Sequence, residues 1–237
     1  GHTHSHRYRS RAFSTCSGDR PLVVQFCGND VDCMVKAALL VEGKCDAVDI
    51  NLGCPQREAR NMGYGAFLLD PLHRERVLQI VTAMAAALTV PLTCKIRLLP
   101  TTAETVTFAK ELEAAGCALL AVHGRQRGST DKRRHGPADL EAVRAVKRAV
   151  RIPVVSNGNT RNYKDVVKNL ELSECDGVMS AEGVLHNPAL FNGITSPSKF
   201  TLAREYLGLA QLHRTPLDWA ARHINKMLKF RLQQSGL

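Results

Sequence analysis

The sequence predicts an α/β protein of the (β/α)8 TIM-barrel type, built around a parallel sheet. Short segments rich in β-branched residues alternate with longer amphipathic segments along most of the chain. Most of the short segments are continuously apolar, which is typical of parallel strands buried on both faces. Strict alternation predicts right-handed β-α-β crossovers, and six units in about 160 residues match the repeat length of a barrel.

Each predicted element has its own signal in the chain. The predicted strands are Leu22–Phe26, Ala47–Leu52, Leu92–Ile96, Leu119–His123, Val154–Asn157 and Gly177–Ser180. The predicted helices between them are Val31–Glu42, Arg74–Leu88, Ala103–Ala115, Leu140–Ala149 and Tyr163–Leu170. In Ala103–Ala115, for example, Val106, Ala109 and Leu112 recur at helical spacing. A doubly wound open sheet is the alternative, but its usual GxGxxG turn after the first strand is absent.

The alternation of strands and helices stops after Ser180. The segments predicted as helices beyond it are Asn187–Phe191, Leu202–Gln211 and Trp219–Leu232. We therefore predict three parts, an irregular segment at 1–19, a partial barrel domain at 20–192 and the start of a helical domain at 193–237.

Composition and charge narrow the class of protein. The net charge of +10 and the pI of about 9.4 favour a polyanionic partner such as RNA. The chain has no run of 18 or more apolar residues, so the sequence predicts no membrane span. The N-terminal segment lacks the apolar region of a secretory signal. The eight cysteines show no zinc or disulfide spacing. We expect an intracellular protein, cytoplasmic and/or nuclear.

Polar residues end every predicted strand. In chain order they are Gln25, Asn51 with Cys54, Lys95 with Arg97, His123 with Arg125, Asn157-Gly158-Asn159, and Ser180 to Gly183. In a parallel barrel the carboxyl ends of the strands meet at one rim, where active sites lie. A packed core gives no reason for such a set, so its convergence predicts a functional site.

Each of these residues also has a plainer interpretation. Cys54, placed between Gly53 and Pro55, is a candidate nucleophile or general acid, or an incidental turn cysteine. Lys95 either extends its ammonium into solvent or places positive charge beside a cofactor. His123 is a core histidine or a ligand-binding group. The glycine turns after the last two strands suit a phosphate group, although tight turns explain them equally well.

Basic residues gather in the loops after the strands. They are Arg57 and Arg60, Arg125 and Arg127, and the run Lys132-Arg133-Arg134-His135. Any one of these groups alone is usually a solvated loop. Together they predict that the mouth of the barrel binds an RNA backbone.

Several motifs together resemble the tRNA-dihydrouridine synthase family. The motifs are Val48-Asp49-Ile50-Asn51-Leu52-Gly53-Cys54-Pro55, Gly63-Tyr64-Gly65-Ala66-Phe67-Leu68, Thr93-Cys94-Lys95-Ile96-Arg97, Val122-His123-Gly124-Arg125 and Ser156-Asn157-Gly158-Asn159. The segments 177–183 and 186–191 look most like the eukaryotic type, which modifies positions sixteen and seventeen of the tRNA D-loop. The resemblance covers roughly residues 19 to 232.

The resemblance implies reduction of uridine to 5,6-dihydrouridine in tRNA, on a (β/α)8 barrel that holds FMN and uses NADPH as reductant. By motif match, Cys54 would be the general acid, and Asn51 and Arg97 would face the uracil. The residues implied to bind the cofactor are Gln25, Lys95, His123, Asn157, Gly158, Asn159, Ala181, Glu182 and Gly183. We expect tRNA as partner, no membrane and no metal; the oligomeric state does not follow from the sequence, and a monomer is the default.

Three departures from the family pattern stand out. The first two strands of the family barrel have no counterpart, Glu182 replaces an arginine that bacterial relatives carry in the last phosphate turn, and the helical domain is short. A six-stranded sheet cannot close as an eight-stranded barrel does. We therefore expect a fragment or variant that by itself binds FMN poorly.

Two other functions stay open on the sequence alone. His2, His4 and His6 form an HxH pattern like that of metal-dependent barrel hydrolases, or else a tag-like terminus. The second alternative is an inactive, flavin-free chain that acts only as an RNA-binding module. Other FMN barrels, such as dihydroorotate dehydrogenases, have different residues around their Asn-Cys or Asn-Ser elements.

Overall fold

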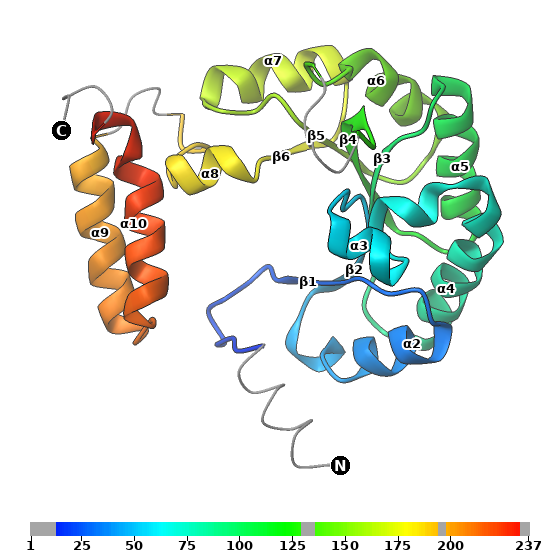
Figure 1. Ribbon diagram of the computed structural model, residues 1–237, viewed down its shortest axis with the longest axis horizontal. Helices are drawn as coiled ribbons and strands as arrows, with labels where there is room; N and C mark the ends of the chain where they lie inside the picture. Colours follow the sequence, from blue (N-terminus) through cyan, green and yellow to red (C-terminus); the bar gives the residue numbers. More distant parts are fainter. Residues whose placement is uncertain (1–12, 129–135, 194–197, 233–237) are drawn as a thin grey trace.

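The fold is a curved parallel sheet with helices on its outer side (Figure 1). A computed structural model describes residues 13–128, 136–193 and 198–232. Its strands are β1 (Val23–Phe26), β2 (Ala47–Leu52), β3 (Leu92–Leu98), β4 (Leu119–Gln126), β5 (Val154–Asn157) and β6 (Gly177–Met179). They pair in chain order, each parallel to the next. The predicted barrel-like arrangement is confirmed. The doubly wound alternative is excluded, because the strands of a doubly wound sheet do not lie in chain order.

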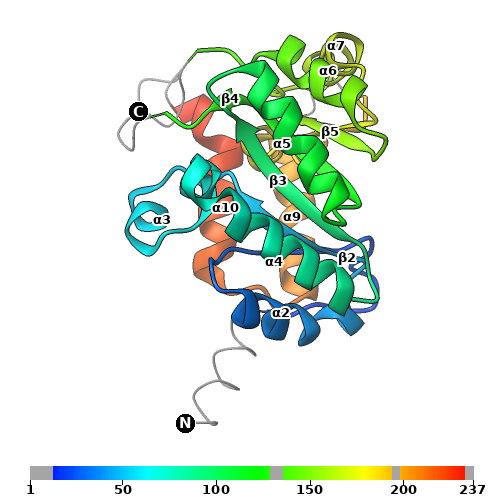
Figure 2. The same cartoon turned by 90° about the vertical axis from the view of Figure 1, so that its right-hand side faces the viewer.

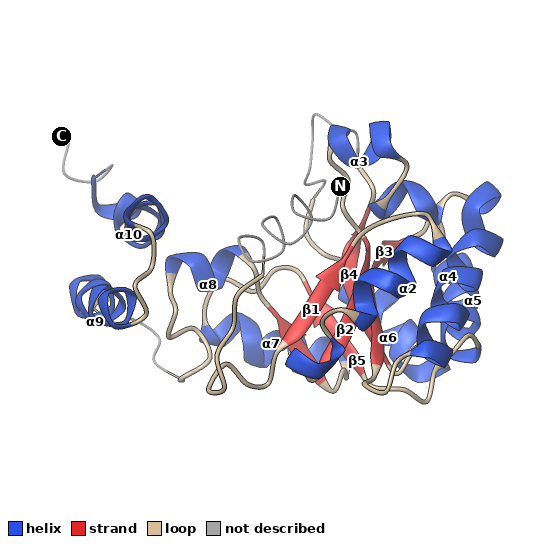
Figure 3. Ribbon diagram, turned by 90° about the horizontal axis from the view of Figure 1, so that it is seen from below, coloured by secondary structure: helices blue, strands red, loops and turns tan. Residues whose placement is uncertain are grey.

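The helices that follow the strands form the outer layer. The long ones are α2 (Val31–Leu39), α4 (Arg74–Ala87), α5 (Thr102–Ala114), α6 (Leu140–Ala149) and α7 (Tyr163–Ser173). Shorter ones are η1 (Glu42–Lys44), α3 (Arg57–Met62), η2 (Gly65–Leu69) and η3 (Pro71–His73). Figure 2 shows α4 and α5 across the outer face of β3, and Figure 3 shows α2, α4 and α5 together on one side of the strands.

Polar caps set the start of four of the long helices. Asp30, Thr101, Asp139 and Asn162 each accept a hydrogen bond from the backbone N–H three residues further on. At α5 the cap is reciprocal, because the Glu104 side chain also accepts from the Thr101 backbone N–H. These caps satisfy N–H groups that a helix cannot pair internally.

The two faces of the sheet differ in chemistry. Side chains alternate along a strand, so residues two apart share a face. On the outer face Ile50, Ile96 and Leu120 are fully buried, and they belong to one apolar core with Phe108 and Leu112 of α5. Polar side chains occupy the inner, concave face. Burial of the apolar face therefore dictates the register, and the register turns the polar residues inward.

Three helices follow β6. They are α8 (Glu182–His186), α9 (Lys199–Leu212) and α10 (Leu217–Leu232). The last two lie side by side (Figures 1 and 3), with Tyr206 and His223 packed edge to face at 4.5 Å between ring centroids. His186 Nδ1 lies 2.7 Å from the carbonyl oxygen of Lys226, which links α8 to α10.

The predicted helix Asn187–Phe191 is wrong. This segment is a series of turns, and the short helix α8 precedes it at Glu182–His186. Pro188 is the physical reason, because a proline disfavours helical backbone in the residue before it. Asn187 accordingly has φ −142° and ψ 90°, which ends the helix.

Several strand and helix boundaries also differ from the prediction. β3 continues to Leu98 and β4 to Gln126, so Arg97 and Arg125 lie within strands and not after them. The register between these strands shifts at Arg97 and Leu98. Among the described helices, none has both the length and the apolar character that crossing a membrane requires.

Candidate functional site

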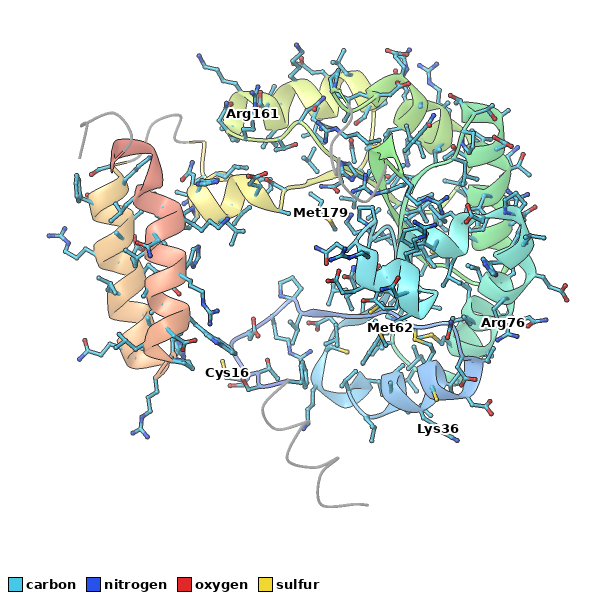
Figure 4. The ribbon with its side chains drawn as sticks, viewed as in Figure 1. Cys16, Lys36, Met62, Arg76, Arg161 and Met179 are labelled. Atoms are coloured by element: carbon cyan, nitrogen blue, oxygen red, sulfur yellow. The ribbon has the colours of Figure 1, made fainter. Side chains whose placement is uncertain are left out.

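A row of polar side chains lines the concave face of the sheet. Paired strand residues bring them into register: Gln25 with Asp49, Asn51 with Lys95, Arg97 with His123, His123 with Asn157, and Asn157 with Met179. Met179, labelled in Figure 4, lies at the end of β6 beside Asn157. The residues that the sequence places at separate strand ends are therefore neighbours in space.

Side chains from β2 and β3 hold the loop that contains Cys54. Asn51 Oδ1 accepts hydrogen bonds from the backbone N–H groups of Gly53 and Cys54, each with an N···O distance of 3.0 Å. Arg97 Nε donates to the carbonyl oxygen of Gly53 at 2.6 Å. Cys54 is a half-buried free thiol. The backbone of Cys54 is thus held in a defined position at the carboxyl edge of the sheet.

A second segment, η2, packs directly on Cys54. The Ala66 backbone N–H donates to the Cys54 carbonyl oxygen at 3.0 Å. Gly65 has φ +66°, and a Cβ atom there would lie 2.8 Å from the Cys54 oxygen and 2.9 Å from its Cβ. Only glycine fits so close to the loop, because other residues disfavour this φ and carry a Cβ.

Arg127, just beyond β4, fastens η2 in place. Its Nη1 donates to the carbonyl oxygen of Ala66 at 3.1 Å and to Asp70 Oδ2 at 3.0 Å. Its guanidinium also lies 4.7 Å from the centre of the Phe67 ring. Of the basic loop residues, Arg127 is therefore engaged within the protein, whereas Arg57 and Arg60 on α3 are exposed.

Two residues that the sequence analysis did not select complete the concave face. Asp49 is buried, with an exposed fraction of 6%, and it accepts hydrogen bonds from Gln25 Nε2 at 2.7 Å and from Thr93 Oγ1 at 2.6 Å. Burial raises the pKa of Asp49 above its ordinary value, although both hydrogen bonds oppose that shift. The missed signal is the alternation of polar residues inside β2 and β3, at Asp49 with Asn51 and at Thr93 with Lys95.

Positive charge is concentrated at the centre of the row. Burial and the neighbouring Arg97 lower the pKa of Lys95. Burial and the charge of Arg125 lower the pKa of Arg97. Within the part of the chain that the structure describes, the Lys95 ammonium donates no hydrogen bond. A cluster of this kind favours an anionic ligand.

The strands β4 and β5 contribute a linked histidine, arginine and asparagine. Arg125 Nη1 lies 3.1 Å from His123 Nε2, and its Nη2 donates to Asn159 Oδ1 at 2.8 Å. Because guanidinium groups only donate, Nε2 of His123 acts as the acceptor here. Asn157 Nδ2 donates to the Met179 carbonyl oxygen at 2.8 Å, which ties β5 to β6.

A cavity of about 1190 Å³ opens beside these residues. Its walls include His123, Arg125, Asn157 to Asn159 and Ala181 to Gly183. Gly158 has φ +118°, and a Cβ on Gly183 would lie 2.6 Å from Ser180 Oγ and from the Thr160 carbonyl oxygen. Glycine is therefore required at both turns, by the positive φ at Gly158 and by the close packing at Gly183.

All twelve predicted site residues lie on this face or in this cavity. Gln25, Asn51, Cys54, Lys95, Arg97 and His123 occupy the first four strands and the β2 loop, whereas Asn157 to Asn159 and Ala181 to Gly183 border the cavity. Glu182 is exposed at the start of α8. The basic run 132–135 and the three N-terminal histidines lie outside the described residues.

Fold and site together define a TIM-barrel-like α/β protein with a candidate ligand-binding face at the carboxyl edge of its strands. Comparison with known proteins then gives the family. The profile of dihydrouridine synthase (Dus) matches residues 2–237. The chain belongs to this family.

Named relatives span most of the chain. A rat protein named tRNA-dihydrouridine(16/17) synthase [NAD(P)(+)]-like is 46% identical over 222 residues, covering 92% of this chain and 49% of its own length. The tRNA-dihydrouridine(16/17) synthase [NAD(P)(+)] of Schizosaccharomyces pombe is 36% identical over 242 residues, with 97% and 59% covered. The chain spans about half the length of these relatives.

Among solved structures, a putative dihydrodipicolinate synthetase from Pseudomonas aeruginosa matches with a TM-score of 0.51 and 18% identity. The match covers 88% of this chain and 81% of that one. At this identity the likeness concerns the fold alone, and it agrees with a barrel-like arrangement.

Proposed function

We propose that this chain carries the catalytic face of an FMN-dependent tRNA-dihydrouridine synthase, which reduces uridine to 5,6-dihydrouridine in the tRNA D-loop. The observation that carries the proposal is the arrangement of Cys54. Its backbone is fixed by Asn51 and η2 beside the Lys95–Arg97 charge cluster. Family membership and the names of the relatives, which include NAD(P)(+), support the same reaction. We propose NADPH as the reductant.

The concave face and the cavity fit a flavin mononucleotide. An FMN ring accepts hydrogen bonds and carries negative charge when reduced, which suits the Lys95 ammonium, Gln25 and His123. The glycine turns at Gly158 and Gly183 border the cavity and suit a phosphate group. Asn157, Asn159, Ala181 and Glu182 border the same cavity. When bound, the reduced flavin would supply the hydride.

Cys54 is the proposed proton donor. A uracil ring that accepts a hydride on one carbon of its 5,6 double bond needs a proton on the other, and a thiol held over the ring can deliver it. Asn51 and Arg97 would orient the ring. Asn51 already uses its Oδ1 and one N–H inside the protein, and Arg97 uses two N–H groups. What remains on both residues are donors, which match the carbonyl oxygens of uracil.

The proposed partner is tRNA, held through its phosphates. The exposed Arg57 and Arg60 on α3 lie a few residues beyond Cys54 in the chain, where a bound strand would pass. The relatives named for positions 16 and 17 suggest these uridines as the target. We place the enzyme inside the cell with its substrate, and we propose that α9 and α10 belong to a helical tRNA-binding region.

The extent of the chain bears on activity. In the described sheet β1 and β6 are the two ends and do not pair with each other. Since the chain spans about half of its relatives, we propose that the strands that close the family barrel lie outside it. Flavin binding by this chain alone would then be weak.

The test is the visible absorbance of the purified chain with and without added FMN, followed by reduction of unmodified tRNA by wild-type protein and Cys54→Ala. With FMN added in excess, a bound flavin, turnover by the wild type and loss of turnover in the variant are expected. Binding of tRNA without flavin and without dihydrouridine would support the alternative, a module that only binds RNA. Equal turnover by both proteins would remove Cys54 as the acid.

A further inference from the structure

Asp49 lies at the start of a directional chain of hydrogen bonds on the concave face. Its carboxylate is buried and accepts from two strands at once, from Gln25 Nε2 on β1 and from Thr93 Oγ1 on β3. Each oxygen has its own donor, because Gln25 bonds Oδ2 and Thr93 bonds Oδ1. The carboxylate is thereby fixed between its two neighbouring strands.

The acceptor-only character of Asp49 decides the orientation of Gln25. An amide has a donor end and an acceptor end, and only the donor end can face a carboxylate. With Nε2 turned to Asp49, Oε1 of Gln25 accepts from Asn51 Nδ2 at 2.9 Å. Turning the amide over would set an oxygen against the carboxylate, which is unfavourable in a buried site.

The orientation of Gln25 in turn decides that of Asn51. Since Nδ2 of Asn51 faces Gln25, its Oδ1 faces the loop and accepts from the N–H groups of Gly53 and Cys54. If Asn51 were turned over, an NH₂ group would face these two donors and both bonds would be lost. The carboxylate of Asp49 therefore determines which end of each amide faces its neighbour, from Gln25 through Asn51 to the backbone of Cys54.

We propose that Asp49 is a positioning residue, which acts through Gln25 and Asn51 to hold the Cys54 loop in its working orientation. Its importance for uridine reduction rests on the proposed function; its effect on the loop does not. Asp49 does not contact Cys54 itself, and it supplies hydrogen-bond polarity, not charge transfer or proton transfer.

The alternative is that Asp49 has only a structural role and joins three strands through its hydrogen bonds. Asp46 provides a matched control, because it also joins the β1 and β2 segments: its Oδ2 accepts from the Leu22 backbone N–H at 2.6 Å and lies 3.2 Å from Arg20 Nη1. This clip sits at the opposite, amino-terminal edge of the sheet. Asp46→Ala therefore removes an interstrand clip without touching the chain that leads to Cys54.

The test measures amide hydrogen exchange at Gly53 and Cys54 in the full chain, for wild type, Asp49→Ala, Asp49→Asn and Asp46→Ala. We expect Asp49→Ala to speed exchange about tenfold or more, since two amides lose their fixed orientation, and Asp46→Ala to leave it unchanged. Asp49→Asn should restore most of the protection, because its Oδ1 can accept from Gln25 while its Nδ2 donates to Thr93 Oγ1.

Two results would overturn the proposal. One is equal exchange at these amides in Asp49→Ala and Asp46→Ala; the other is no rescue by Asp49→Asn. If Asp49→Ala does not fold, Thr93→Val removes one of the two donors to Asp49 with little change in shape. It should speed Cys54 exchange roughly threefold, and unchanged exchange in that variant would also refute the role.

Uridine reduction is the second readout. In Asp49→Ala the kcat should fall about a hundredfold, as expected for a displaced catalytic group, with recovery in Asp49→Asn. If no protein in the series, wild type included, reduces uridine, the proposed function fails. The exchange rates still decide whether Asp49 positions the loop.

Discussion

Replacing Gly65 with alanine should displace the Cys54 loop. The new methyl group would lie 2.8 Å from the Cys54 carbonyl oxygen, 2.9 Å from its Cβ and 3.2 Å from its nitrogen. Two of these atoms are backbone and cannot swing aside as a side chain would. Either η2 or the Cys54 loop must move, and the hydrogen bond from Ala66 to Cys54 is lost with it.

A matched control separates this clash from backbone strain. Gly136 has φ +61°, close to the +66° of Gly65, but a Cβ there meets nothing within 4 Å. Alanine in left-handed backbone costs about 1–2 kcal/mol at either position. Only Gly65→Ala adds overpacking, at about 1–3 kcal/mol. The total is about 2–5 kcal/mol for Gly65→Ala against about 1–2 kcal/mol for Gly136→Ala.

Thermal unfolding and the reactivity of Cys54 measure the difference. In a chain of this size each kcal/mol lowers the melting temperature by about 2–4 °C, so Gly65→Ala should melt several degrees below Gly136→Ala. The rate of Cys54 alkylation should change only in Gly65→Ala, and uridine reduction should fall at least tenfold in that variant alone. Equal melting temperatures and equal alkylation rates in the two variants would refute the packing argument.

Three further predictions concern Cys54, Lys95 and Asp176. Cys54→Ala should keep the absorbance spectrum of any bound flavin and lose most reduction of uridine, which a tRNA assay measures; unchanged turnover would contradict the acid role. Lys95→Met should weaken FMN binding in a titration. It should also stabilise the flavin-free protein by about 1 kcal/mol, because burial disfavours the ammonium. Tighter FMN binding by the variant would contradict the proposed role of Lys95. A hydrogen bond from Lys147 and one from the Val154 backbone N–H hold the pKa of Asp176 below its ordinary 3.8, so its stabilisation is present above that pH and is lost as the pH falls through the lowered pKa. The difference in melting temperature between wild type and Asp176→Asn should therefore shrink in acid, and a constant difference would exclude this linkage.

Local sequence was enough to predict the order of strands and helices. The prediction of Ala47–Leu52, Val154–Asn157 and Leu140–Ala149 matches the structure residue for residue. These elements have clear apolar periodicity and sharp boundaries, such as the Asp139 cap. Where polar residues extend a strand, as at the end of β4, the periodicity ends before the strand does.

The site was predicted only in part, because its organisation depends on pairs far apart in the chain. Asp49 and Thr93 are 44 residues apart and meet only through the register of β2 and β3. Arg127 reaches Ala66 across 61 residues. No local pattern distinguishes such residues from an ordinary strand polar group or a solvated loop arginine. Cys54 was easier to select, since Gly and Pro flank it directly after a strand.

Rapid mixing of the flavin-reduced protein with unmodified tRNA tests the central claim most directly. The absorbance of oxidised flavin should return when tRNA carrying uridine is added, and it should return at least a hundredfold more slowly in Cys54→Ala. Dihydrouridine should form in step with that signal. Equal rates in the two proteins, or flavin oxidation without dihydrouridine, would contradict the account of Cys54 as the proton donor for uridine reduction.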